Sequence, residues 1–175
     1  QNGKLAIMQK VQRYFLEIKF KDQNKLDLYS TTQPEITFIK TKDFEVNKYF
    51  YKKIGADHFW RDRLIWTDKE WFKYISNENL TTYVMKNKNE YIGFYEKEFH
   101  AEKNEIELIN FGILKKFRGM KLGSALLKHS IKTSFNYKPE RIWVHTCSLD
   151  HKYALNNYQS KGFKIFKKEE INFVA

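Results

Sequence analysis

The stretch EIELINFGILKKFRGMKLGSALL, residues 105–127, decides the fold that we predict for this chain. Residues 106–113 are mostly apolar and typical of a strand. Residues 115–123 form a turn that carries four basic side chains and two glycines. From about residue 122 onward, apolar side chains recur at helical spacing. The stretch therefore predicts a strand, a short basic turn and a helix.

A basic turn that leads into a helix is suited to bind a phosphate group. The first amides of a helix have no partner inside the helix, and the helix dipole adds positive charge there. Glycine lets a bound anion come close to the backbone. An ordinary basic connection between a strand and a helix explains the turn equally well, since short turns with glycine are common.

The composition is that of a folded domain with a basic surface. The chain has 175 residues, which suits one domain, and its 42% hydrophobic and 17% aromatic content can form a packed core. The net charge is +11, which fits an anionic cofactor, nucleic acid or an anionic surface. Because the basic residues are scattered over the chain, part of this charge needs no function. We favour an anionic cofactor combined with such background charge.

The single cysteine, Cys147, excludes an internal disulfide and a cysteine-based zinc site, and it fits a reducing compartment. No window approaches the roughly 20 apolar residues of a membrane-spanning helix. The first residues, QNGKLAIM, contain too short an apolar run for a signal peptide. Met8 could be the native start. We expect a soluble cytoplasmic protein.

Hydrophobic periodicity and turn residues predict alternating strands and helices. Helices are expected at residues 43–54 and 68–75. A third helix is expected to begin at residue 121. A fourth is expected to end at residue 161, with Asp150 as its N-cap and Gly162 after its last residue. Thr67 and Glu70 form a capping box for the second helix. A hairpin turn is expected at residues 87–90. Strands are expected at residues 12–20, 26–29, 35–40, 81–86, 90–99, 106–113 and 141–147, and a last strand is expected to open at residues 163–166. This order predicts a mixed α/β domain.

Two segments together resemble the GNAT superfamily of acetyl-CoA-dependent N-acetyltransferases. FGILKKFRGMKLGSALL (residues 111–127) is similar to its strand and R-x-x-G-x-G signature. WVHTCSLDHKYALNNYQSKGF (residues 143–163) is similar to its A-x-x-x-Y-x-x-x-G-F segment, in matching order and distance. In addition, KYFYKKIGADHFWRDRLIWTDKEW (residues 48–71) resembles a bacterial subgroup with a W-x-x-R-rich second helix.

The resemblance implies a GNAT-like fold: an α/β (α+β) domain with a central, mostly antiparallel sheet, splayed strands and flanking helices. We expect one domain over residues 1–175. The resemblance covers residues 43–168, and residues 1–42 are expected as a strand-rich addition. It further implies acetyl-CoA as the acetyl donor, a primary amine of a small molecule or peptide as acceptor, and no metal.

In this family the cofactor's pantetheine lies between two diverging strands and pairs with backbone groups, which implies Phe111 and Ile113 here. The cofactor-binding residues implied are Phe111, Gly112, Ile113, Arg118, Gly119, Met120, Lys121, Leu122, Gly123, Ser124, His151 and Tyr158. Two positions depart from the family pattern: Lys121 replaces the middle glycine of the signature, and His151 replaces a frequent asparagine. A lysine at a position that requires positive φ would be strained.

Acetyl transfer needs a group that takes a proton from the amine and another that gives one to the leaving sulfur. The resemblance implies Tyr158 as the acid; a core tyrosine is the alternative. Glu107 is the first candidate for the base, and Glu105 and His145 are weaker candidates. Each of the three has a purely structural alternative. The expected acceptor-binding residues are His58, Trp60, Asp62, Arg63 and Trp66, which could equally form a core between helices.

Three functions remain open from the sequence. We favour an N-acetyltransferase in which the amine attacks acetyl-CoA directly, over a nucleophilic mechanism through Cys147 and His151. A catalytically silent acyl-CoA-binding domain is the first alternative, and a basic nucleic-acid-binding module is the least favoured. We expect no membrane partner, and the sequence leaves a homodimer open.

Overall fold

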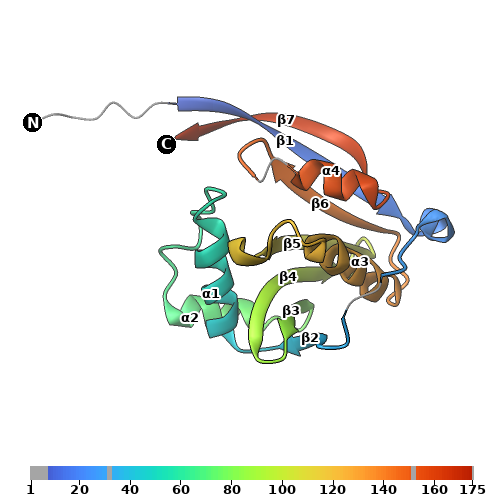
Figure 1. Ribbon diagram of the computed structural model, residues 1–175. Coiled ribbons are helices and arrows are strands. Elements are labelled where there is room, and N and C mark those ends of the chain that lie inside the picture. Colours follow the sequence, from blue (N-terminus) through green and yellow to red (C-terminus); the bar gives the residue numbers. More distant parts are fainter. Residues whose placement is uncertain (1–7, 31–32, 151–152, 175) are drawn as a thin grey trace, which may run out of the picture.

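The computed structural model describes residues 8–30, 33–150 and 153–174, which form one seven-stranded sheet with helices on both faces (Figure 1). The strands are β1 (Met8–Lys19), β2 (Ile36–Thr41), β3 (Leu80–Asn87), β4 (Glu90–His100), β5 (Glu105–Ile113), β6 (Arg141–Cys147) and β7 (Lys164–Val174). The helices are α1 (Phe44–Gly55), α2 (Asp68–Ile75), α3 (Leu122–Phe135) and α4 (Ala154–Ser160), with short 3₁₀ helices at Phe20–Lys25 and Lys115–Phe117. This mixed architecture confirms the predicted fold class.

The spatial order of the strands is β2-β3-β4-β5-β6-β1-β7. Neighbours are antiparallel except β5 and β6, which run parallel and pair only from Glu105–Arg141 to Leu108–Val144. Beyond that point the two strands diverge. Figure 1 accordingly shows two halves, one with β2 to β5 and the other with β6, β1, β7 and α4.

Alternating residues of β4 show how the helices cover the sheet. Phe94 stacks on Phe50 of α1 with ring centroids 5.0 Å apart. The next residue, Tyr95, points to the opposite face, where its hydroxyl lies 3.0 Å from Thr133 of α3. Because successive side chains of a strand point to opposite faces, α1 and α2 cover one face of this half and α3 covers the other.

The larger apolar core lies on the α3 face. It contains fully buried Leu126, Leu127 and Ile131 of α3, packed with residues of β1, β4, β5 and β6. A smaller cluster of Phe50, Ile54, Val84 and Phe94 lies under α1. Burial of large apolar side chains of this kind typically stabilises a fold by about 1.5–3 kcal/mol each.

Strand β1 lies between β6 and the edge strand β7, although it is the first described element of the chain. It pairs along Arg13–Lys19 with β6 and along Met8–Glu17 with β7. We expected residues 1–42 to be an addition to the region of resemblance, yet Leu16 and Ile18 of β1 are buried in the main core. Residues 8–19 are thus part of the same sheet as the rest of the chain.

Several local predictions are confirmed. Helix α1 is capped by Asp43, whose carboxylate accepts from the Glu45 amide at 3.0 Å. Helix α2 has the predicted capping box, in which Thr67 and Glu70 bond to each other's backbone amides. The hairpin β3–β4 turns where expected.

Two other local predictions are wrong. Residues 26–29 form no strand. The last strand, predicted to open at residues 163–166, begins at Lys164 and extends to Val174, and it pairs with Met8–Glu17 of β1. Asp150 is not the N-cap of α4, which begins at Ala154 after Tyr153; its carboxylate bonds instead to Thr146 and Cys147. None of the described helices has the length and apolar character required to span a membrane.

Candidate active site

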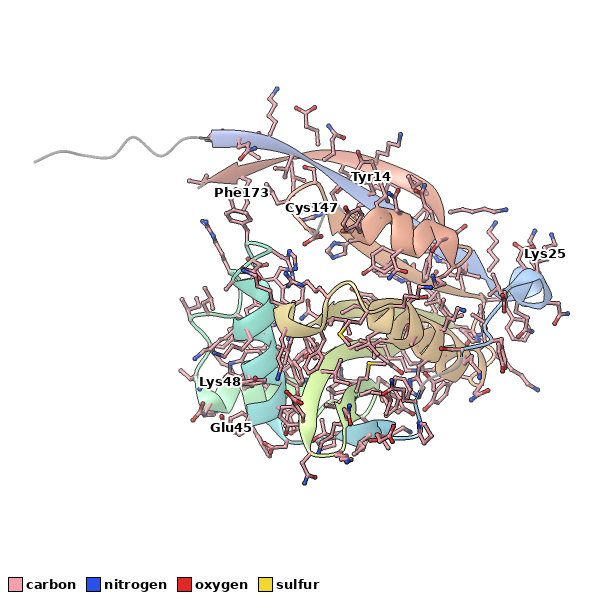
Figure 2. The ribbon with its side chains drawn as sticks, viewed as in Figure 1. Tyr14, Lys25, Glu45, Lys48, Cys147 and Phe173 are labelled. Carbon is pink, nitrogen blue, oxygen red and sulfur yellow. The ribbon has the colours of Figure 1, made fainter. Side chains whose placement is uncertain are left out.

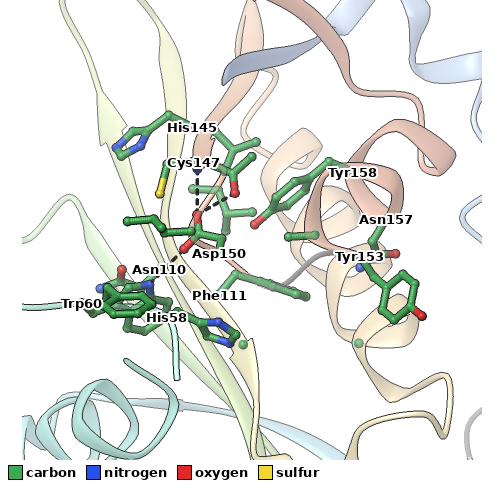
Figure 3. A pocket seen from close by; sticks show the side chains of 18 of the residues that line it. His58, Trp60, Asn110, Phe111, His145, Cys147, Asp150, Tyr153, Asn157 and Tyr158 are labelled. Carbon is green, nitrogen blue, oxygen red and sulfur yellow. Dashed lines mark hydrogen bonds between the residues drawn. The ribbon is translucent and has the colours of Figure 1, made fainter. Parts of the chain in front are cut away.

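A cavity of about 800 Å³ opens where β5 and β6 diverge. Its walls come from both halves of the molecule: the end of β5 and the start of α3 on one side, and β6, β1, β7 and α4 on the other. The segment after α1, residues 58–63, forms a further wall. Figure 3 shows Phe111 and Tyr158 facing each other across this space, with Asp150 and His145 nearby.

The end of β5 leaves backbone groups free toward the cavity. A bulge at Ile109 shifts the register, so that Glu96 and Lys97 of β4 pair with Asn110 and Leu108. After the strand, the Leu114 amide donates to Ile92 on the β4 side at 2.8 Å. Because successive amides of a strand point to alternate edges, those of Ile113 and Phe111 point toward β6, where no strand pairs with them. This edge can accept an extended ligand.

The basic turn places unpaired amides at the cavity. In the described part of the chain, the amides of residues 119–124 have no acceptor, whereas that of Arg118 donates to Lys115 at 3.2 Å. We expected the amides from Arg118 onward to bind pyrophosphate; the Arg118 amide is already occupied. The free amides lie at the N-terminus of α3, where a helix favours an anion.

Two residues of this turn have left-handed backbone conformations. Gly119 has φ +81°, and Lys121, the N-cap of α3, has φ +61°. Lys121 therefore has the strained positive φ that we considered when this lysine was found in place of the family's middle glycine. Such a conformation costs about 1–2 kcal/mol for a residue with a Cβ atom.

The turn fits a closely bound anion. A Cβ atom on Gly119 would meet no other atom within 4 Å, and one on Gly123 would meet only Ile113, at 3.6 Å. Packing within the chain thus does not require glycine at position 123. Both glycines line the cavity, so the space that a Cβ would fill is open to a ligand. The residues present therefore fit the pyrophosphate of CoA.

The side chain of Arg118 connects this turn to the segment after α1. Its guanidinium donates to Asp57 and to His58, both at 3.3 Å. The turn and the opposite wall of the cavity are thereby held in one arrangement.

Tyr158 of α4 is 7% exposed and lies between Phe111 and Phe163, with ring centroids 6.2 and 5.6 Å away. Burial raises the pKa of its hydroxyl well above the ordinary value, and the Asp150 carboxylate adds to the shift. The hydroxyl lines the cavity and keeps its proton throughout the neutral range, as a proton donor requires.

Asp150 organises the end of β6. Its carboxylate accepts from the Thr146 hydroxyl at 2.6 Å, the Cys147 amide at 2.8 Å and the Trp60 indole at 3.4 Å. Burial raises the pKa of the Cys147 thiol, and the Asp150 charge adds to this. A thiol in this state is a poor nucleophile.

His145 of β6 lines the cavity, and strand alternation places it on the face of the sheet opposite to buried Val144 and Thr146. Its ring lies 5.7 Å from that of Phe15. Although His145 keeps an exposed surface, partial desolvation by its neighbours lowers the pKa of the imidazole, and the Arg13 charge lowers it further; Glu107, Asp150 and Glu169 partly oppose the shift. A neutral imidazole at neutral pH is able to accept a proton.

The first candidate for the base is placed differently. The Glu107 carboxylate lies 3.0 Å from His100 Nε2, and Glu107 does not line the cavity. Glu105 accepts from Arg141 at 2.9 Å and also lies outside it. Of the three base candidates named from the sequence, only His145 faces the cavity.

The acceptor-side residues separate into two groups. His58, Trp60, Asp62 and Arg63 line the cavity, whereas Trp66 packs against Trp71, with centroids 4.9 Å apart. Tyr51 and Asn110, which were not singled out from the sequence, line the cavity beside them.

Arg63 anchors this wall to the sheet. Its guanidinium donates to the Glu96 carboxylate at 3.1 Å, and Glu96 is fully buried. Glu96 also accepts from Tyr74, Asn47 and Asn110 at 2.7–3.0 Å. The guanidinium lies over several aromatic rings, those of Tyr51, Trp66, Trp71 and Tyr74.

The structure thus brings most of the predicted cofactor residues together. Those that line the cavity are Phe111, Gly112, Ile113, Arg118, Gly119, Lys121, Gly123 and Tyr158. Met120, Leu122 and Ser124 belong to the same turn without lining it, and His151 lies outside the described residues. Sequence patterns missed Arg13, Ile171 and Phe173, which reach the cavity only through the pairing of β1 with β7. Among the described residues, no cluster of side chains could hold a metal ion.

Comparison with known proteins supports these observations. The family model described as acetyltransferase (GNAT) family matches residues 44–163. No curated protein matches the chain significantly.

Solved structures of several acetyltransferases share the fold. A GCN5-related N-acetyltransferase from Kribbella flavida has a TM-score of 0.64 at 12% identity, over 94% of this chain and 58% of its own. A second one, from Sphaerobacter thermophilus, has a TM-score of 0.69 at 12% identity, over 93% of this chain and 50% of its own. An aminoglycoside acetyltransferase from an uncultured soil metagenomic sample has a TM-score of 0.61 at 15% identity, over 73% and 87%. This chain thus spans 58% of the length of the Kribbella flavida protein and 50% of the length of the Sphaerobacter thermophilus protein.

Proposed function

Because the chain belongs to the acetyltransferase (GNAT) family, we propose that it transfers an acetyl group from acetyl-CoA to a primary amine. The observation that carries this proposal is the cavity between β5 and β6, which joins an unpaired strand edge, a helix N-terminus with free amides and a protonated buried tyrosine. These are the features that a donor with an amide-bearing arm and a pyrophosphate requires.

The donor would be held by backbone groups and a few cations. The amides of Phe111 and Ile113 would pair with pantetheine as an added strand does. The free amides of residues 119–124 and the Lys121 ammonium would receive the pyrophosphate. When bound, acetyl-CoA supplies the activated acetyl group.

The remaining chemistry falls to side chains of the cavity. A lysine-like amine has a pKa near ~10.4 and an α-amine near ~8, so the acceptor arrives mostly protonated at neutral pH. His145 is the group that we assign to take this proton, because its imidazole is neutral and faces the cavity. Tyr158 would return a proton to the departing sulfur as the new amide bond forms and the thioester bond breaks.

Positioning contributes as well. The anchored wall of Trp60 to Arg63 and the donor-binding edge of β5 face the same cavity. Fixing the amine and the thioester together in this way lowers the entropic part of the barrier. The reducing environment of the cytoplasm, suggested by the free Cys147, is the location that we propose for this reaction.

The test is release of free CoA thiol from acetyl-CoA across a panel of amines, with formation of the acetylated product followed by mass spectrometry. We expect amine-dependent release, together with protection of the protein against thermal unfolding by CoA. Protection without release for any amine would identify a silent acyl-CoA-binding domain. Absence of both would remove the proposal altogether.

A further inference from the structure

Four arginines line the cavity: Arg13, Arg61, Arg63 and Arg118. Three of them already have partners in the chain. Arg118 bonds to Asp57 and Arg63 to Glu96. Arg61 donates to the Val174 carbonyl at 3.1 Å and lies 4.8 Å from the centre of the Phe173 ring.

Arg13 of β1 differs from the other three. Its Nε is buried, and no hydrogen-bond acceptor for it exists among the described residues. Within the same part of the chain, no carboxylate lies at ion-pair distance from its guanidinium. A buried donor without an acceptor is costly, and such groups in native structures usually have a ligand or water to satisfy them.

The carboxylates nearest to Arg13 along the sheet have other partners. Glu169, its partner on β7, lies 2.7 Å from Lys167. Asp150, close to Cys147 on the β6 side, is held by Thr146 and by the Cys147 amide. The charge of Arg13 therefore remains available to a molecule in the cavity.

The same face of the sheet offers apolar contacts next to Arg13. Val11 of β1 pairs with Ile171 of β7, and both line the cavity. Phe173 lines it two residues further on. His145, to which we assign the base role, lies on this same face. Arg13 is paired with Cys147 of β6 and Phe15 with His145, and residues two positions apart on a strand point to the same face.

From these contacts we propose that Arg13 binds a carboxylate of the acceptor, so that the substrate is an amine that also carries a carboxylic acid. This inference rests on the proposed function and specifies its acceptor. The carboxylate meets the guanidinium, the amine lies toward His145, and the apolar part lies against Val11, Ile171 and Phe173. A guanidinium suits a carboxylate because its planar donors match both oxygens.

A monoanion fits better than a phosphate ester at this place. Asp62 and Asp150 also line the cavity, and Glu169 neighbours Arg13 on β7. Three carboxylates around one unpaired arginine disfavour a dianion by repulsion.

The test measures binding by isothermal titration calorimetry to the full chain saturated with CoA. The probes are L-phenylalanine and L-methionine, each compared with its amide, which keeps the amine and the apolar side chain but lacks the carboxylate. We expect each acid to bind about tenfold or more tightly than its amide, as a charge-assisted hydrogen bond implies. Arg13→Met should reduce this ratio to about one by weakening the acid alone. Because the acid and the amide differ in amine pKa, the change of the ratio on mutation isolates Arg13.

Two further variants control for charge and folding. Arg13→Lys keeps the charge without the planar fork and should retain only part of the preference; it decides the matter if Arg13→Met does not fold. Lys10→Met removes a cation from the same strand, where Lys10 pairs with exposed Glu170, and should leave the ratio unchanged.

Equal binding of acids and amides to the unmodified protein would overturn the inference. A loss of CoA affinity in Arg13→Met would also overturn it, because Arg13 would then serve the donor. Preferential binding of acids without acetyl transfer to any amine would retain the carboxylate site and overturn the transferase proposal instead.

Discussion

The guanidinium of Arg63 lies 3.1 Å from the carboxylate of Glu96, and the two side chains are 10% and 0% exposed. This ion pair joins the wall after α1 to strand β4 beneath the bulge of β5. A buried charge that loses its partner is strongly destabilising, whereas removal of both charges is far less so.

We therefore expect Arg63→Met to lower the free energy of unfolding by about 3 kcal/mol or more, measured by urea denaturation. The double variant Arg63→Met with Glu96→Gln should be more stable than Arg63→Met alone. Removal of the exposed Lys10–Glu170 pair serves as the control and should change stability little. A double variant less stable than Arg63→Met alone would show that the unpaired Glu96 charge is not the cause of the destabilisation.

Tyr158→Phe should lower kcat about a hundredfold or more, because the ring remains in place while the proton donor is lost. Its packing against Phe111 and Phe163 is retained, so CoA affinity should be nearly unchanged. Steady-state kinetics and CoA titration check the two parts. Tyr29→Phe, at a residue 76% exposed, is the control. An unchanged kcat would remove Tyr158 from the acid role.

The acid limb of the pH–rate profile should report His145. Partial desolvation and the Arg13 charge lower the pKa of His145 below its usual value of 6.5. The neutral, proton-accepting form therefore persists to lower pH, and kcat/KM should fall only below 6.5. Removing Arg13 should move this limb to higher pH.

Glu107→Gln should move the same limb to lower pH, because its charge opposes the shift at His145. His145→Gln should lose the limb together with most of the rate. A pH–rate profile that is unchanged by substitution of Arg13, Glu107 and His145 would assign proton removal to another group.

Lys121→Gly should raise the free energy of unfolding by about 1 kcal/mol, since glycine adopts positive φ without strain. Lys121→Ala keeps a Cβ in the same conformation and should give no such gain. Both variants lose the ammonium and should bind CoA more weakly, as calorimetry can measure. Equal stability of the glycine and alanine variants would show that φ +61° at this position is not strained.

We expect buried Lys97 to make the free energy of unfolding depend on pH above neutrality. It is 3% exposed, and its ammonium donates to Thr133 at 2.8 Å and to Ser134 at 3.1 Å. Burial lowers its pKa from 10.5 to about 7, and nearby Lys40 adds to the shift. Between these two values the unfolded chain binds the proton and the folded chain does not. Stability should therefore rise with pH there, by up to about 1.4 kcal/mol per unit.

Lys97→Met should abolish this slope and increase stability at neutral pH. Urea denaturation from pH 7 to about 9.5, below the range where most tyrosines ionise, compares the pH dependence of the free energy of unfolding between Lys97→Met and the unmodified protein. A slope that survives the substitution would assign it to other groups.

Signals confined to one segment of sequence predicted much of the fold. The capping box of Thr67 and Glu70, the hairpin β3–β4 and the basic turn before α3 each depend on neighbouring residues, and all three are present. The donor side of the candidate site follows from the same turn. Most of the residues implied for cofactor binding lie between Phe111 and Ser124, so a short motif contains them, whereas Tyr158 comes from a second motif.

The acceptor side could not be predicted in the same way. Arg13 and Phe173 are 160 positions apart and meet the cavity only because β1 pairs with β7. The position of Glu107 also depended on tertiary context, since a strand residue that points outward can bond to the adjacent strand, as it does to His100. Asp150 resembled an N-cap, yet the chain continues for three more residues before the helix begins.

The insertion of β1 between β6 and β7 has a consequence for the order of assembly during synthesis. Strand β1 is synthesised before both of its neighbours in the sheet, so this half of the sheet cannot close until β6 and β7 have been synthesised. Until then both edges of β1 lack their strand partners, and such edges can pair with other chains. The cavity wall formed by β1, β6 and β7 can thus be completed only after β7 has been synthesised.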